Sequence, residues 1–170
     1  MVVNNMDSLY LRIQALSNEL ATLEGIEKQI SDALPDVQDD VFCTAITDTG
    51  LKKKVEKLFR DGHHARAVEE AFKYLDNVVK KKSGDTSDSS GAALMTRVFS
   101  ANSPVLKINS MNTRSEKDEQ LGYMNILQGC MTGIRNPRAH ESDWEDTEQH
   151  CLELLILANH LIERVRLSTK

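Results

Sequence analysis

The sequence predicts an all-α fold, and two observations carry that prediction. Apolar residues recur at spacings of three and four along nearly the whole chain, which is the period of an amphipathic helix, and no segment shows the alternation typical of a strand. The 170 residues, 40% hydrophobic and 28% charged, suit one globular domain with an appended helix. We therefore expect a helical bundle over residues 50–167 that is preceded by a separate helix over residues 1–35.

The separate helix is predicted by a heptad pattern at the N-terminus. Apolar residues alternate in steps of four and three, Glu27 is the one polar position, and Pro35 ends the pattern. The positions are Leu9, Ile13, Leu16, Leu20, Leu23, Ile30 and Leu34. This pattern is typical of a coiled-coil-like helix, or of a long helix packed on a partner.

The bundle is predicted from amphipathic segments between residues 51 and 165. We expect helices near residues 51–59, 62–82, 92–99, 115–134 and 142–165, with "SGDTSDSSG" (residues 83–91) as a flexible connection. The expected N-caps are Asp61 or Gly62 for the second helix and two capping boxes, Ser115 with Asp118 and Ser142 with Glu145. The expected core faces of the last two helices are Leu121, Met124, Leu127, Met131 and Ile134, and Cys151, Leu155, Ala158, Ile162 and Val165.

Charge is unevenly distributed along the chain. The net charge of the chain is −5. Residues 51–82 nevertheless carry ten basic and five acidic side chains, whereas residues 1–50 carry two basic and nine acidic side chains. A basic stripe on one face can bind nucleic acid in an acidic protein, although lysine runs are also ordinary solvated helix ends. Both interpretations of residues 51–82 stay open at this point.

Several classes of protein are disfavoured by the sequence. No run of 18 apolar residues predicts a membrane span, and the first residues lack the basic and apolar regions of a secretion signal. The three cysteines show no C-x-x-C spacing, which is typical of reduced thiols in a cytoplasmic protein. Cys130 and Cys151 lie on apolar faces and are expected in the core. We expect no cofactor.

The segment "GIRNPRAH" (residues 133–140) concentrates groups that suit RNA cleavage. Pro137 disfavours helix at Asn136, so we expect Asn136 to cap a new turn and the break to let Arg135 and His140 face a common point. Arg135 would bind phosphate, His140 would take the proton of a ribose 2′-OH, and Asn136 would orient either group. Arg138 is the expected RNA contact, and no spacing here suggests a metal. The alternative is a capped turn between two helices.

Longer stretches around this segment resemble a known family. "RNPRAH" resembles the R-x4-6-H motif of the HEPN superfamily, which comprises all-α nucleases of prokaryotic defence and toxin systems. Residues 59–84, 118–141 and 151–165 look like the uncharacterised Ymh-type family, which is placed among HEPN proteins. The resemblance covers about residues 50–167. Some HEPN toxins carry a Tyr two residues after the motif His, where a partner nucleotidyltransferase modifies it; Ser142 stands there in this chain.

The resemblance implies a homodimer or higher oligomer in which two motifs form one composite cleft. It also implies cleavage without metal that leaves 2′,3′-cyclic phosphate ends, with Arg135, Asn136 and His140 as the motif residues. We therefore expect an endoribonuclease whose activity is restrained, with the N-terminal helix as a candidate site for a regulatory protein. The alternative is a non-catalytic module that binds a protein partner or a nucleotide.

Overall fold

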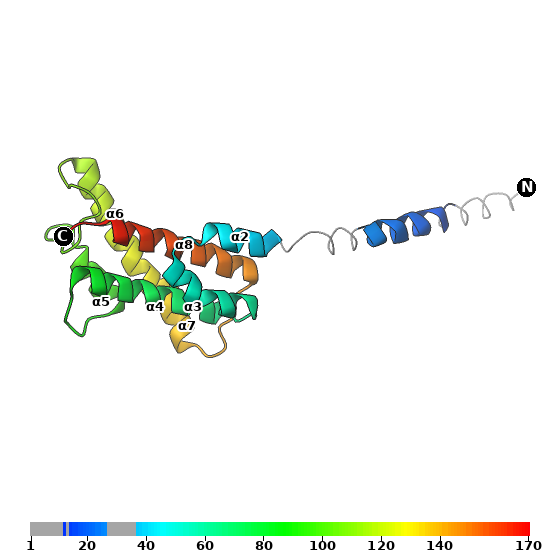
Figure 1. The fold of residues 1–170 in the computed structure, drawn as a ribbon, viewed down its shortest axis with the longest axis horizontal. Helices are drawn as coiled ribbons and strands as arrows, with labels where there is room; N and C mark the ends of the chain where they lie inside the picture. Colours follow the sequence, from blue (N-terminus) through cyan, green and yellow to red (C-terminus); the bar gives the residue numbers. More distant parts are fainter. Residues whose placement is uncertain (1–11, 13, 27–36) are drawn as a thin grey trace, which may run out of the picture. The chain divides into compact units, whose positions relative to one another are not determined.

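The computed structural model describes residue 12, residues 14–26 and residues 37–170, and these residues fall into two units, Met1–Cys43 and Thr44–Lys170. The predicted all-α class is confirmed for the described residues, which form helices and no strand (Figure 1). One isolated antiparallel bridge joins Lys107 to Thr169. None of the helices in these residues is long and apolar enough to span a membrane.

In the first unit, residues 14–26 are helical, as the heptad pattern predicts. Its apolar side chains are exposed: Leu16, Leu20 and Leu23 are 64%, 61% and 62% exposed, and Ile26 is 46% exposed. The other heptad positions, Leu9, Ile13, Ile30 and Leu34, lie outside the described residues. A helix that the sequence did not predict, α2 (Val37–Ala45), spans the boundary between the two units.

The second unit is built around α4 (His64–Ser83). This helix packs against α3 (Thr49–Arg60) and α8 (Glu148–Leu167), and it also contacts α5 (Gly91–Val98) and the later helices η1 and α7 (Figure 1). Ala67, Phe72, Leu75 and Val79 of α4 are fully buried. The spacing predicts a core face of Ala65, Val68, Phe72, Leu75 and Val79 for this helix. All of these except the half-buried Ala65 are fully buried, so this face lies at the centre of the core.

The core face predicted for α8 is confirmed. Its five members are all fully buried, and they are Cys151, Leu155, Ala158, Ile162 and Val165. Burial raises the pKa of the Cys151 thiol to about 12 and that of the Cys130 thiol to about 11, so both cysteines are protonated core residues, as expected.

Helix α6 (Arg114–Gly129) follows the prediction only in part. Leu127 and Met131, which lies two residues beyond the end of α6, are buried, but Leu121 is 41% exposed. The difference arises because α6 packs mainly on α5, so its first turns are not covered by α4. A capping box opens α6 at Thr113 and Glu116, two residues before the predicted one.

Two further caps differ from the prediction. His63, which makes no side-chain cap bond, precedes α4 in place of Asp61 or Gly62. Thr147, whose hydroxyl accepts from the His150 N–H at 3.2 Å, precedes α8 in place of Ser142. Residues 141–147 are therefore a loop.

Candidate functional site

The segment 133–140 lies on a continuous helix. Helix α6 passes into a π-helical turn, η1 (Cys130–Arg135), and then into α7 (Asn136–His140), with helical dihedral angles at Gly129, Arg135 and Asn136. The predicted cap and break at Asn136 are therefore wrong: the N–H of Asn136 donates to the carbonyl of Met131, five residues back. The chain leaves the helix only at Glu141, where the backbone is extended.

The wider π turn explains how Pro137 stays inside the helix. Proline has no N–H to donate, and in an α-helix its ring meets the carbonyl four residues earlier. A turn closed by i→i+5 bonds just before the proline moves that carbonyl away from the ring. The same turn changes the direction in which the following side chains point relative to those of α6.

Arg135 and His140 do not converge within one chain. Five residues along a continuous helix place two side chains about 140° apart. In the structure the two residues line different cavities. The first, here called the His140 cavity, has a volume of about 950 Å³ and is lined by residues 62–66, 69 and 138–146. The second, here called the Arg135 cavity, has a volume of about 300 Å³ and is lined by Lys73, Asp76, Asn77, Lys80, Ser90, Met131 and Arg135.

Asn136 contacts Arg135 rather than His140. The side chain of Arg135 is half-buried, and its Nη1 donates to the Oδ1 of Asn136 at 3.0 Å. Because an amide oxygen is neutral, this bond orients the guanidinium without neutralising it. In the part of the chain that the structure describes, Arg135 forms no salt bridge.

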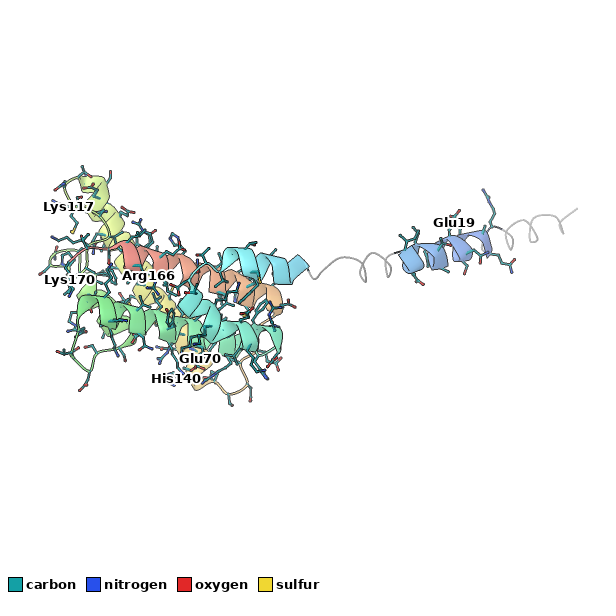
Figure 2. The ribbon with its side chains drawn as sticks, in the orientation of Figure 1. Glu19, Glu70, Lys117, His140, Arg166 and Lys170 are labelled. Atoms are coloured by element: carbon teal, nitrogen blue, oxygen red, sulfur yellow. The ribbon has the colours of Figure 1, made fainter. Side chains whose placement is uncertain are left out.

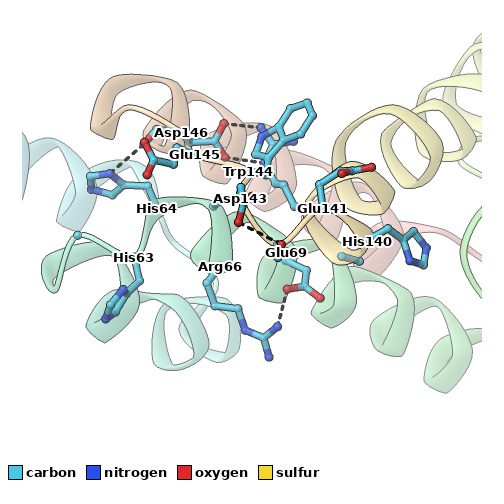
Figure 3. Close-up of a pocket in the computed structure, with 15 residues that line it drawn as sticks. His63, His64, Arg66, Glu69, His140, Glu141, Asp143, Trp144, Glu145 and Asp146 are labelled. Carbon is cyan, nitrogen blue, oxygen red and sulfur yellow. Dashed lines mark hydrogen bonds and ion pairs between the residues drawn. The ribbon is translucent and has the colours of Figure 1, made fainter.

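His140 is exposed at the end of α7, on the edge of the bundle (Figure 2). It lies at the opposite end of its cavity from His63 and His64 (Figure 3). His64 is a structural residue, since its Nδ1 lies 3.3 Å from the carbonyl of Asp146 and its own carbonyl accepts from the Cys151 thiol at 3.4 Å. No three His, Cys, Asp or Glu side chains among the described residues are arranged to hold a metal ion.

Arg138 is held in a buried ion pair with Asp146. Nε and Nη2 of Arg138 each donate to a carboxylate oxygen of Asp146 at 2.6 Å, and Nη1 donates to the carbonyl of Ile134 at 2.7 Å. The side chains of Arg138 and Asp146 are both 3% exposed. The guanidinium also stacks on Trp144, 5.3 Å from the ring centroid. Each guanidinium nitrogen of Arg138 therefore already donates a hydrogen bond. The buried side chain does not offer the RNA contact that the sequence predicts. We assign this residue a positioning role, in which it fixes the loop 141–147 against α7.

Asp146 was not singled out by the sequence. It stands among Asp143, Glu145 and Glu148, and that cluster suggests the acidic first turn of a helix. The Arg138 pair draws the Asp146 carboxylate away from such a turn, which explains why α8 begins only at Glu148.

The two cavities differ in charge. The His140 cavity contains Arg66 and Arg138 against five carboxylates, whereas the Arg135 cavity contains Lys73, Lys80 and Arg135 against Asp76 alone. Glu69 lies between them along α4, bonded to Arg66 Nη1 at 2.5 Å and to Lys73 Nζ at 2.7 Å. Burial alone would raise the pKa of Glu69, but Lys73 and Arg66 outweigh it and lower the pKa, so this carboxylate is ionised.

One family model matches the chain. It describes a protein of unknown function (Hypoth_ymh) and matches residues 46–165, a range that contains both cavities and the whole segment 133–140. No curated protein and no solved structure matches the chain significantly.

Proposed function

The chain belongs to the Hypoth_ymh family, and on that premise we propose that it is a metal-independent endoribonuclease of the HEPN superfamily. The observation that carries the proposal is the different use of the two arginines in the segment 133–140. Arg138 forms a buried ion pair with Asp146, whereas Arg135 lines a cavity with two lysines. Among the described residues the guanidinium of Arg135 forms no salt bridge, so it is suited to bind a phosphate.

The proposed reaction is a transfer at phosphorus. His140 takes the proton of a ribose 2′-OH, O2′ bonds to the adjacent phosphorus, and the bond to the 5′-oxygen breaks. Arg135 stabilises the negative charge that develops on the phosphoryl oxygens. The departing 5′-oxygen takes a proton from solvent water, and the imidazolium of His140 returns its proton to solvent. One product then carries a 2′,3′-cyclic phosphate and the other a 5′-hydroxyl.

A composite site in a homodimer is supported by the separation of the two motif residues. Within one chain, Arg135 and His140 line different cavities, so one copy does not present both to the same phosphate. Two copies packed with their α7 helices together would place Arg135 of one copy beside His140 of the other. Such an enzyme would fit a prokaryotic defence or toxin system.

The test is cleavage of a mixed RNA by the full chain in excess EDTA. We expect His140→Ala to lose cleavage by about 100-fold or more, the typical contribution of a general base, while products of the unaltered chain carry cyclic phosphate ends. The matched control is His150→Ala, because His150 has an exposed side chain and lines neither cavity. Equal cleavage by the unaltered chain and His140→Ala would refute the assignment of His140.

Mixing two inactive variants tests the composite site. His140→Ala and Arg135→Ala chains should each be inactive, and dimers formed from both should regain cleavage because one interface then holds an intact Arg135 and an intact His140. If verified mixed dimers remained inactive, the shared site would be contradicted.

A second candidate function rests on the exposed apolar side chains of residues 14–26. Leu16, Leu20 and Leu23 are more than half exposed, and a helix with such a stripe binds another helix. The alternative is therefore a non-catalytic interaction module whose partner binds this stripe. A folded chain that cleaves no RNA but captures a helical partner would favour it.

A further inference from the structure

We infer that the Arg135 cavity is a binding subsite for a backbone phosphate of single-stranded RNA, with Lys73, Lys80 and Ser90 as ligands alongside Arg135. The identity of the polymer rests on the proposed function, whereas the binding of an anion rests on the cavity itself. The inference adds three residues to the site, and none of them belongs to the segment 133–140.

Three elements that are distant in the sequence build the cavity. Helix α4 contributes Lys73, Asp76, Asn77 and Lys80, which follow one another at i, i+3, i+4 and i+7 and so share one face of the helix. Ser90 immediately precedes α5, and η1 contributes Met131 and Arg135. Such a spacing normally marks a core face, yet here the stripe is polar and faces a cavity of about 300 Å³.

The charge of the cavity favours an anion. Its lining holds three cations and one carboxylate, Asp76. The Oδ1 of Asp76 accepts from the Gly91 N–H at 2.6 Å, and its Oδ2 lies 3.3 Å from Lys80 Nζ. Among the described residues, Arg135 is the cation of the lining that forms no salt bridge. Asp76 therefore anchors the start of α5 and aligns Lys80. Lys73 is shared with Glu69 and Glu70, at 2.7 and 3.3 Å.

Neutral donors complete the cavity. Ser90 occupies the N-cap position of α5, but with φ −147° and ψ 167° its side chain makes no cap hydrogen bond. Its hydroxyl is therefore available to a ligand, as is the amide of Asn77 on the facing helix. Phosphate oxygens accept hydrogen bonds from cationic and hydroxyl donors, and bonds to the cations are the strong ones.

The neighbouring His140 cavity disfavours the same ligand, because five carboxylates outnumber its two arginines. A phosphate that approaches this face of the bundle is thus attracted to the Arg135 cavity and repelled by the other. The pattern favours a single strand that is held at Arg135 while its ribose reaches a His140.

The test is binding of a fluorescent 2′-O-methyl oligoribonucleotide, which lacks the nucleophilic hydroxyl and is not cleaved. The oligonucleotide is titrated at several salt concentrations with the unaltered full chain and with three variants of it. The variants are Lys80→Gln, Ser90→Ala and the control Lys81→Gln. Lys81 is the adjacent residue on α4, its loss removes the same charge, and it does not line the cavity.

We expect Lys80→Gln to raise the Kd about 10-fold relative to Lys81→Gln and to reduce the slope of log Kd against log salt by about one. Ser90→Ala should raise the Kd less, and inorganic phosphate should compete with the oligonucleotide. Equal Kd values for Lys80→Gln and Lys81→Gln, or no binding by the unaltered chain, would overturn the inference.

The cleavage assay separates this inference from the proposed function. If RNA is cleaved but Lys80→Gln binds as Lys81→Gln does, the subsite is refuted and the nuclease stands. If neither the full chain nor the chain without residues 1–34 cleaves RNA, and yet phosphate binding depends on Lys80, the anion site stands and the nuclease is refuted.

Discussion

Arg135 and Arg138, three residues apart, show how differently two arginines of one motif are used. Arg138 is 3% exposed at its side chain and forms a two-pronged pair with Asp146, whereas Arg135 is half-buried and bonded to a neutral amide. The difference arises from the helix, which directs one residue at the loop 141–147 and the other at α4. Arg135 can therefore bind an anionic ligand, whereas the guanidinium of Arg138 is already paired with a carboxylate.

At this scale we predict that Arg138→Ala destabilises the fold by about 3–5 kcal/mol, because it leaves the buried Asp146 carboxylate unpaired. The double variant Arg138→Met with Asp146→Asn should be less destabilised than Arg138→Ala, since no buried charge then lacks a partner. Urea unfolding followed by circular dichroism measures both values. A loss below about 1 kcal/mol for Arg138→Ala would show that the pair is not structural.

Gln120 of α6 fixes the irregular segment that joins α5 to α6. Its side chain on α6 is fully buried, donates to the carbonyls of Phe99 and Leu106 at 3.0 and 3.1 Å, and accepts from the Ile108 N–H at 2.8 Å. One amide thereby satisfies three backbone groups between α5 and α6. This explains why Leu106 and Ile108 can be buried in a segment without helix.

We predict that Gln120→Leu lowers the free energy of unfolding by about 2–4 kcal/mol, because buried carbonyl and N–H groups lose their partners. The matched control is Gln128→Leu on the same helix, where the side chain is exposed and the change should stay within about 0.5 kcal/mol. Hydrogen exchange at the Ile108 amide should accelerate only in Gln120→Leu. Equal losses in the two variants would contradict the proposed anchoring.

At the scale of the whole molecule, the chain divides its properties between two units. The unit Thr44–Lys170 contains nearly all of the buried core and both cavities, whereas the described helix 14–26 exposes its apolar stripe. The first 50 residues are also the most acidic part of the chain. This division favours a binding or regulatory role for the N-terminal helix and places the proposed chemistry in the bundle.

We predict that deleting residues 1–34 shifts the Tm by less than about 3 °C, because the deleted residues precede the unit that holds the core. The deletion should change the assembly state or raise RNA cleavage, as expected if the helix joins chains or restrains the site. Calorimetry, sedimentation and the EDTA cleavage assay measure the three effects. An unaltered assembly together with unaltered cleavage would leave the N-terminal helix without the proposed role.

The helical class and the buried faces of α4 and α8 can be predicted from the sequence, because they depend on local periodicity. Long, strongly periodic helices meet little competition from tertiary contacts, so Phe72, Leu75 and Leu155 are buried as their spacing predicts. The Thr113 and Glu116 capping box was equally visible in the sequence, since it fits the usual pattern better than Ser115 with Asp118.

Only the tertiary structure decided where the motif side chains point. A proline after Asn136 predicts a break by local rules, but the π turn absorbs Pro137 and keeps Arg135 and His140 on one helix, facing different cavities. The pairing of Arg138 with Asp146 likewise overrides a good local cap at Ser142. In the second case a pair between residues eight positions apart outweighs about 1 kcal/mol of local capping preference, and no capping pattern reports such a pair.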